Sequence, residues 1–365
     1  MFSQSGFMGG SLPPKTLCLT YDDGPGATDG DGLGPHSLEL AQFLSDQGIR
    51  ATFFNIGQHA AQYPDVVSQV HDLGHLIGNH TLDHPSLPDY LTGGGDVYTE
   101  VAYTDGYIRE WVDSPTVFFR PPYGNWSADL ANTLNKSLAV CRDHVGPILW
   151  DIDGQDWLHW RNKDSVDTCL KDYVDKINAT QRGIVLMHDS SWDLDIKENE
   201  NTFALTQQLI PILKGQGYQF VRLDEIPEIQ AAAQAPLQVS FQAFNGNYVS
   251  VGDLGTGEML MNAAVAPLQE TFTVESLGFD RVALKASNGL YVSPQGGGAD
   301  SAPVMANGPA VGPWEPLKIV TVGLGKVAFE TVNGYYLTME NAGGGRFMAN
   351  SPWIRQEEVF SINVQ

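Results

Sequence analysis

Two acidic residues, Asp22 and Asp23, stand side by side at the end of the apolar run in "LTYDDGPG". Two ionised carboxylates so close together repel each other, and a buried site strengthens the repulsion. A positive group nearby, or a proton on one carboxylate, must therefore compensate. Gly24 and Pro25 end the predicted strand, so side-chain alternation need not hold and both carboxylates can face one site.

Two histidines, His80 and His84 in "GNHTLDHP", have a spacing at which both imidazoles reach one metal ion. Taken alone the spacing is weak evidence, because a hydrogen-bonded loop explains it equally well. Together with one carboxylate of the acidic pair, they make the three-ligand zinc set that leaves a position open for water. The other carboxylate would then act as a base. A second pair, His71 and His75, straddles Leu73–Gly74, which resembles a helix end, so we expect those two rings to diverge.

The composition limits the class of protein. A chain of 365 residues favours two domains, and 42% hydrophobic residues suffice for a sizeable core. The 20 basic against 43 acidic residues argue against a nucleic-acid partner and against an anionic membrane surface. No apolar run is long enough to predict a membrane span. Solubility, or attraction to a cationic substrate or product, would explain the acidic charge.

The three cysteines, Cys18, Cys141 and Cys169, are too few for a disulfide framework and lack a zinc-type spacing. Cys18 is expected to be a buried thiol, whereas Cys141 and Cys169 could pair in an oxidising compartment, which the sequence leaves open. The first ten residues have no basic start and no long apolar stretch, so no leader is visible. Either the protein is cytosolic or its leader has been removed, and we expect a secreted or cell-wall protein.

Up to about residue 229, short apolar runs alternate with helix-like stretches. Strands are expected at "LCLTYD", "ATFFNIG", "HLIGNH", "VFFRPPYG", "ILWDID", "GIVLMHD" and "QFVRLDE", and helices at "PHSLELAQFLSDQGI" and "FALTQQLIPILKGQGY". This alternation predicts an α/β fold with a mainly parallel sheet, long enough to close into a barrel. Polar residues stand at the C-terminal ends of the strands, where such barrels place their active sites.

The composition changes after residues 230–236, which lie in "IPEIQAAAQAPLQ" and are predicted to be a linker. An Asn-Gly motif then recurs at spacings of 43 and 45 residues, as "NGNYVS" at Asn245, "NGLYVS" at Asn288 and "NGYYLT" at Asn333. A second motif recurs in step, as "ETFTV" from Glu270, "EPLKI" from Glu315 and "EVFSI" from Glu358. Three such units predict a β-trefoil over residues 237–365. Its core is expected to include the recurring residues Phe272, Tyr291, Leu317, Tyr336 and Phe360.

Five motifs occur in a fixed order: "TYDDGP", "HTLDHP", "RPPYG", "DGQDW" and "LMH". In that order and rough spacing they resemble the motifs of the polysaccharide deacetylases, the family 4 carbohydrate esterases. The resemblance covers roughly residues 15–225, with Tyr21 in place of the usual Phe, and "RPPYGNW" and "ILWDIDGQDW" look most like fungal chitin deacetylases. It implies a distorted (β/α) barrel as the catalytic domain, residues 1–229. The second half, with "VALKASNGLYVS" and "VAFETVNGYYLT", resembles fascin-type trefoils and lacks the Gln-x-Trp signature of ricin-type lectins.

The family resemblance also implies roles for the acidic pair and the histidines. Asp22 would be the general base, and Asp23 would hold a metal ion with His80 and His84. Zinc is the expected ion, with Co²⁺ or Ni²⁺ as alternatives. Arg120 would pair with Asp22 and hold it ionised, which supplies the missing positive charge.

The remaining motifs would complete the catalytic site. The backbone N–H of Tyr123 would donate to the oxyanion. Asp156 would orient His188, the general acid, and raise its pKa. The other substrate-binding residues implied are Trp157 and Leu186, which would line the acetyl pocket, and Asp153, which would contact the Arg120 network.

The implied reaction is hydrolysis of N-acetyl groups on the GlcNAc units of chitin or chitooligosaccharides, with release of acetate. Acetylxylan esterases and peptidoglycan GlcNAc deacetylases share the motifs and are the alternatives among enzymes. A carbohydrate-binding or adhesion protein with an inactive barrel is the alternative of another class. The trefoil is expected to bind a glycan or a cell-wall surface, or to be a purely structural appendage.

Overall fold

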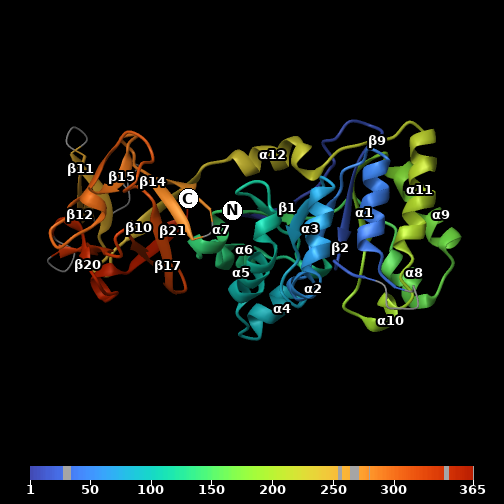
Figure 1. Ribbon diagram of the computed structural model, residues 1–365, viewed down its shortest axis with the longest axis horizontal. Helices are drawn as coiled ribbons and strands as arrows, with labels where there is room; N and C mark the ends of the chain where they lie inside the picture. The colour runs from blue at the N-terminus through green and yellow to red at the C-terminus, as the bar shows by residue number, and fades with distance from the viewer. Residues whose placement is uncertain (28–33, 254–256, 264–270, 279, 341–344, 365) are drawn as a thin grey trace. The chain divides into compact units, whose positions relative to one another are not determined.

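The computed structural model describes residues 1–27, 34–253, 257–263, 271–278, 280–340 and 345–364 (Figure 1). The chain divides into two compact units. Residues 2–131 and 144–234 form the first, here called the α/β unit, and residues 1, 132–143 and 235–365 form the second, the β-rich unit. Within the described residues, no helix has both the length and the apolar character needed to cross a membrane.

The α/β unit contains a six-stranded sheet in the order β4-β3-β2-β8-β7, with β9 paired to β2. Its strands are β2 (Thr16–Asp22), β3 (Thr52–Asn55), β4 (Leu76–Asn79), β7 (Ile152–Asp153), β8 (Arg182–His188) and β9 (Gln219–Phe220). All of the pairings are parallel, as the alternation of strands and helices predicted. Every residue of β2 is buried, because Leu17, Leu19 and Tyr21 pack in one apolar cluster and Cys18 packs in another on the opposite face.

A second parallel sheet in this unit has three strands in the order β1-β6-β5. These are β1 (Phe2–Phe7), β5 (Val117–Phe118) and β6 (His144–Ile148). An isolated parallel bridge between Asn79 and Phe119 connects the edge strand β4 to the chain just after β5. The strand expected at "ILWDID" is wrong as one element, because β6 ends at Ile148 and β7 begins at Ile152.

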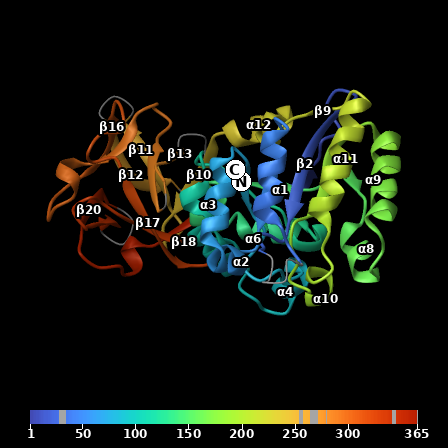
Figure 2. The same cartoon turned by 45° about the vertical axis from the view of Figure 1, so that its right-hand side comes forward.

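Helices α1, α9 and α11 pack side by side beside the larger sheet (Figures 1 and 2). The helices of the chain are α1 (Ser37–Asp46), α2 (Gly57–Gln62), α3 (Pro64–Asp72), α4 (Leu87–Thr92), α5 (Val97–Ile108), α6 (Ala128–Leu134), α7 (Leu138–Cys141), α8 (Asp156–Asn162), α9 (Val166–Thr180), α10 (Leu194–Lys197), α11 (Thr202–Gly215) and α12 (Pro227–Gln234). Helix α12 covers most of the segment predicted to be a linker, residues 230–236, so that segment is largely helical. Pro227 stands at the first position of this helix and alanines fill its interior, both of which favour a helix.

The strands of the β-rich unit are β10 (Leu237–Gln242), β11 (Tyr248–Asp253), β12 (Glu258–Ala263), β13 (Phe272–Ser276), β14 (Arg281–Lys285), β15 (Tyr291–Pro294), β16 (Val304–Gly308), β17 (Leu317–Gly323), β18 (Lys326–Glu330), β19 (Tyr336–Met339), β20 (Phe347–Ser351) and β21 (Phe360–Val364). Antiparallel pairing runs in a closed ring through β10, β13, β14, β17, β18 and β21. The remaining strands form the hairpins β11–β12, β15–β16 and β19–β20.

The Asn-Gly motifs occupy equivalent turns of this unit. Gly246, Gly289 and Gly334 all have a positive φ, of 86, 81 and 81°, which glycine adopts without strain. Each glycine N–H donates to the carbonyl three residues earlier, on Ala243, Ala286 and Thr331 respectively. The repeat found in the sequence is therefore also a repeat of backbone hydrogen bonds.

The recurring apolar residues of this unit are not all in its core. Phe272, Leu317 and Phe360 are buried, but Tyr291 and Tyr336 are only half-buried. These tyrosines are the first residues of their strands, and the Tyr291 hydroxyl donates to the Glu275 carboxylate (2.9 Å). A polar hydroxyl with a charged partner keeps the ring near the surface. Glu270, the first residue of the motif "ETFTV", lies outside the described residues.

Candidate active site

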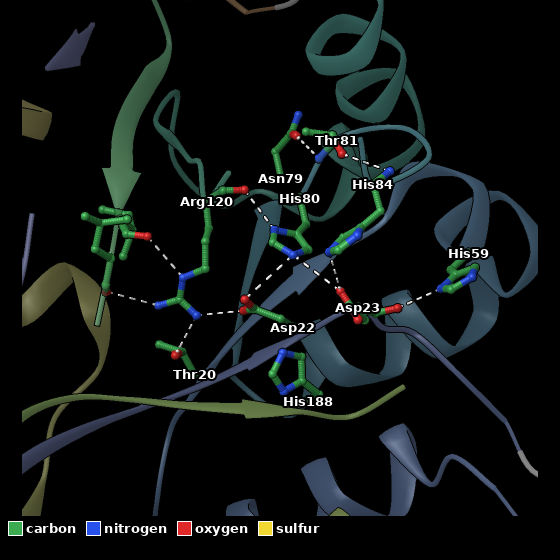
Figure 3. Close-up of polar contacts among 12 residues, drawn as sticks. Thr20, Asp22, Asp23, His59, Asn79, His80, Thr81, His84, Arg120 and His188 are labelled. Carbon is green, nitrogen blue, oxygen red and sulfur yellow. Dashed lines mark hydrogen bonds and ion pairs between the residues drawn. The ribbon is translucent and has the colours of Figure 1, made fainter. Parts of the chain in front are cut away.

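Asp22 and Asp23 lie at the C-terminal end of the central strand β2, and both are buried (3% and 5% exposed). Asp22 is the last residue of the strand, paired in register with His188 at the end of β8. Asp23 has a φ of 70°, a left-handed conformation that interrupts the alternation of side chains. Both carboxylates therefore face the same group of side chains (Figure 3).

Arg120 supplies the positive charge that the acidic pair requires. The guanidinium is fully buried, and one Nη donates to Asp22 Oδ1 (2.7 Å) and to the Thr20 hydroxyl (2.8 Å). Its other nitrogens donate to the carbonyls of Ile148 (3.1 Å) and Leu149 (3.3 Å). A buried arginine with all of these partners is held in one orientation and compensates the charge of Asp22.

The other carboxylate, Asp23, lies beside the two histidines. Its Oδ1 is 3.4 Å from His80 Nε2 and 3.1 Å from His84 Nε2. Burial by itself would raise the pKa of Asp23, but the neighbouring His84 and His80 rings hold it well below its usual value. The His80 Nδ1–H donates to the Arg120 carbonyl (2.8 Å). This bond fixes the tautomer and leaves Nε2 as a lone-pair donor.

These three residues form the group that could hold a metal ion among the described residues, with ligand atoms within 4.8 Å of one another. Asp23 Oδ1 is buried and has no hydrogen-bond partner. A buried carboxylate oxygen without a donor is costly unless a cation lies against it. A divalent cation therefore fits the set. The rings of His71 and His75 have separate partners, since His71 contacts Asp113 (2.7 Å) and His75 contacts the Ala41 carbonyl (2.9 Å).

The loop that carries the histidines is held by side chains to which the sequence analysis assigned no role. Asn79 Oδ1 accepts the N–H of Thr81 (3.0 Å), and the Thr81 hydroxyl accepts the N–H of His84 (3.2 Å). Glu100, on helix α5, accepts the N–H groups of residues 82 and 83 (3.1 and 3.4 Å). Burial raises the pKa of Glu100 to about 7. The acidic pair is held in a similar way, because the Nδ1–H of His59 donates to the backbone carbonyl of Asp23 (2.6 Å).

His188 and Asp156 form a second ion pair near Asp22. Asp156 is the first residue of helix α8 and is fully buried, with Oδ1 at 2.8 Å from His188 Nδ1 and Oδ2 accepting the His188 backbone N–H (2.7 Å). Burial would lower the pKa of His188, but the Asp156 carboxylate outweighs burial and raises it to about 10. The ring is therefore a protonated acid at neutral pH, with its Nδ1–H directed at the carboxylate.

Further hydrogen bonds hold the Asp156 carboxylate in place. The hydroxyl of Thr202, at the start of helix α11, donates to Asp156 Oδ2 (3.3 Å) and accepts the indole N–H of Trp160 (3.0 Å). Buried Glu200 accepts the backbone N–H of Thr202, and burial raises the pKa of Glu200 to about 8. No sequence motif pointed to Glu200 or Thr202, because both act through Asp156 from a distant segment.

The predicted substrate-binding residues have different surroundings. Leu186 is buried in β8, Trp157 is half-buried on α8, and Tyr123 is 53% exposed. Asp153 does not join the Arg120 network, which corrects the expectation. It lies on β7, on the far side of β8 from β2, and its carboxylate accepts the N–H of Gln155 (2.6 Å).

Backbone strain is concentrated at this site. Most of the described non-glycine residues with a positive φ are predicted site residues or adjoin them: Asp23, Thr81, His84, Tyr123 and Gln155. Such conformations are costly and cluster at functional sites, where the surrounding structure imposes them. Tyr123, at φ 60° and ψ 5°, is followed by Gly124, which also has a positive φ (65°). This independent observation marks the same residues that the motifs marked.

Comparison with known proteins gives the family. Residues 9–138 match the family described as polysaccharide deacetylase. A peptidoglycan-N-acetylglucosamine deacetylase of Bacillus cereus is 32% identical over 218 residues, covering 58% of this chain and 88% of that protein. A chitooligosaccharide deacetylase of Azorhizobium caulinodans is 29% identical over 218 residues, covering 56% and 90%. A solved peptidoglycan N-acetylglucosamine deacetylase, Bc1960, aligns with a TM-score of 0.48 at 23% identity, covering 60% and 90%. The chain belongs to the polysaccharide deacetylase family and is a hydrolase of carbon–nitrogen bonds in N-acetylated glycans.

Proposed function

We propose that the protein removes N-acetyl groups from GlcNAc units of chitin or chitooligosaccharides in a reaction that depends on a divalent metal ion, and that this ion is zinc. The observation that carries the proposal is that two groups of side chains lie at one edge of the larger sheet of the α/β unit. The ligand set of Asp23, His80 and His84 lies there, beside the Asp22–Arg120 pair, and β2 places Asp22 in register with His188.

Each residue has a distinct task in the proposed reaction. When bound by Asp23, His80 and His84, a zinc ion would polarise the acetamide carbonyl and would lower the pKa of the attacking water toward neutral pH. Asp22, oriented by Arg120, takes a proton from the attacking water. The backbone N–H of Tyr123 donates to the carbonyl oxygen as negative charge develops on it.

The amide bond then breaks with the help of His188. The amine is a very poor leaving group unless it receives a proton, and His188 is protonated and held by Asp156 (2.8 Å). Water adds to the carbonyl carbon, the C–N bond breaks, and acetate and a free amine are formed. An ester needs this proton less, so the well-placed acid favours N-deacetylation over O-deacetylation.

Peptidoglycan is the second candidate substrate, because relatives named for that activity reach 32% identity. The net charge of -23 makes an anionic wall polymer the less favourable partner. Acetylated xylan is the candidate substrate if the enzyme is an esterase. An acetate-release screen across chitin oligomers, peptidoglycan and acetylated xylan separates the three, and faster release from xylan than from any chitin oligomer contradicts the proposal.

We also infer that the two sheets of the α/β unit belong to a distorted barrel and that the β-rich unit is a fascin-like trefoil. The bridge from Asn79 to Phe119 supports the first inference, since it connects the sheets. The ring of paired strands, the hairpins and the equivalent turns support the second. The predicted catalytic residues all lie in the α/β unit. We therefore assign the trefoil a role in attachment to a glycan or cell-wall surface, outside the cell.

A further inference from the structure

The loop between the two predicted histidine ligands has an unfavourable backbone conformation. Thr81 and His84 both have a left-handed φ, of 69 and 64°, and such conformations persist only where the surrounding structure imposes them. The carbonyls of Thr81 and Leu82 accept the N–H groups of Gly57 (2.8 Å) and Gln58 (3.0 Å), the first residues of helix α2. Helix α2 therefore holds the carbonyl groups of the loop, and the N–H of Thr81 has a different partner.

That partner is the side chain of Asn79, the last residue of strand β4. Its Oδ1 accepts the N–H of Thr81 (3.0 Å; Figure 3). Its Nδ2 donates to the Val101 carbonyl (2.9 Å) and to Asp105 Oδ1 (2.9 Å), both on helix α5. These two acceptors determine which way the buried amide points, because a flipped amide would place its NH2 group against the N–H of Thr81.

Asp105 is itself held by a buried ring from a different strand. His144, on β6, is buried, and its Nε2 lies 3.2 Å from Asp105 Oδ1. The His144 ring is stacked on the ring of Phe2, with 5.3 Å between the centroids and 18° between the planes. Fixed groups therefore connect β6, through helix α5, to the loop with the histidines. Asp105 and His144 both lie outside the sequence motifs, so the motifs give them no role.

We propose that Asp105 is a positioning residue for the metal centre, acting through the orientation of the Asn79 amide. The last connection is the Thr81 hydroxyl, which accepts the N–H of His84 (3.2 Å). With the amide fixed, the loop is ordered before an ion binds, so that binding does not have to order it. This inference rests on the proposed function, because it concerns the same ligand set.

Equilibrium binding of zinc to the metal-free protein tests the inference. In Asp105→Ala the Asn79 amide loses one of its two acceptors. Zinc affinity should then fall about 10–100-fold, the usual effect of removing a group that orients a metal ligand. Alanine favours a helix, so the variant should fold. Asp105→Asn should bind zinc nearly as tightly as the wild type, since its amide oxygen can accept from Asn79 and His144. Competition with a chromophoric chelator gives the affinities.

Asp96→Ala is the matched control, because it weakens the same helix at its first turn, whereas Asp105 lies near the helix end. The Asp96 carboxylate caps α5 by accepting the N–H groups of Tyr98 (3.0 Å) and Thr99 (3.4 Å). This variant should lower Tm and leave the zinc affinity unchanged. Affinity that falls equally in Asp96→Ala and Asp105→Ala, or in neither, contradicts the inference. So does an Asp105→Asn variant that binds as weakly as Asp105→Ala.

Hydrogen exchange in the metal-free protein separates this inference from the proposed reaction. The amides of residues 80–84 should exchange faster in Asp105→Ala than in Asp96→Ala or in the wild type, because the loop loses its fixed acceptor. If this difference is present but the wild type binds no zinc and releases no acetate, the proposed reaction is contradicted and the positioning role of Asp105 is supported. Equal exchange of these amides in the two variants contradicts the positioning role itself.

Discussion

Asp22 and Asp23 are neighbours in the chain but have different partners, and the proposed reaction depends on this difference. Asp22 faces Arg120 (2.7 Å), whereas Asp23 faces His84 (3.1 Å) and has an oxygen without a hydrogen-bond donor. A carboxylate already paired with a buried arginine is a poor ligand for a cation, while an unpartnered one is a good ligand. The structure therefore favours the assignment of Asp22 as the base and Asp23 as the ligand.

Substitution separates the two tasks. Asp23→Ala should remove both the bound metal and the activity, because one of three ligands is lost. Asp22→Asn should lower kcat by about 10²–10⁴-fold, the usual contribution of a general base, and leave the metal content near that of the wild type. Elemental analysis of both variants, with acetate release, is the measurement. Equal loss of metal in the two variants contradicts the assignment.

If His188 is the acid of the proposed reaction, its pKa should set the alkaline limit of activity. The Asp156 carboxylate raises this pKa to about 10 against the effect of burial. Because the proposed acid must carry its proton, activity should be lost as the pH rises through that value. In Asp156→Asn the carboxylate charge is gone while burial remains, so the alkaline limb should move to lower pH. A pH profile of kcat/KM tests this, and an unmoved limb contradicts the role of His188 as the acid.

At the scale of elements, much of the α/β unit could be predicted from local patterns. The buried run of β2 and the periodicity of α1 are visible in short windows, and the spacing of His80 and His84 is local as well. Strand β1, "FSQSGF", was not predicted, because polar and apolar residues do not alternate in it and its partner β6 lies far along the chain. Long-range pairing is the information that a single sequence does not provide.

The same limit applies to the site. The ligand set and the acid–base pair follow from motifs, whereas His59, Glu100 and Glu200 act from other segments through backbone groups. Nothing in their sequence surroundings distinguishes them from ordinary surface or core residues. Asp153 was expected in the Arg120 network for the same reason. Its position on β7, which the motif does not reveal, determines that its carboxylate contacts Gln155 instead.

Glu200, which binds Thr202 next to Asp156, should make the stability of the protein depend on pH. Burial raises the pKa of Glu200 from 4.5 to about 8, so the folded protein holds a proton that the unfolded chain releases within that range. Stability from this group is therefore full below pH 4.5 and is lost as the pH rises toward 8. Glu200→Gln should remove this contribution and raise Tm at pH 8 by about 2–4 °C relative to the wild type. Equal Tm differences at pH 5 and pH 8 contradict the effect.

At the scale of the whole molecule, two units share one chain, and residues 132–143 group with residues 235–365 rather than with their sequence neighbours. The sequence gives no sign of this grouping, because the change in composition occurs only near residue 236. Cys141 and Cys169, which could have paired with each other, are free buried thiols, as is Cys18. The expected domain boundaries at residues 229 and 237 remain a prediction.

Removal of residues 235–365 tests the role of the β-rich unit. If the unit attaches the enzyme to polymer, the truncated protein should keep most of its turnover of soluble chitin oligomers and lose activity on insoluble chitin. The ratio of the two rates is the quantity to measure, since it cancels a general loss of folded enzyme from exposing residues 132–143. A thermal melt controls for folding. An unchanged ratio contradicts attachment and leaves the unit as a structural appendage.

The most direct test of the account is acetate release from chitohexaose by the full chain, before and after metal removal. We expect release of acetate with a free amine on the product, loss of activity with a chelator, and recovery when zinc is restored, with no activity in His188→Ala under any of these conditions. Activity that survives complete removal of the metal, or cleavage of acetylated xylan without action on chitohexaose, would contradict it.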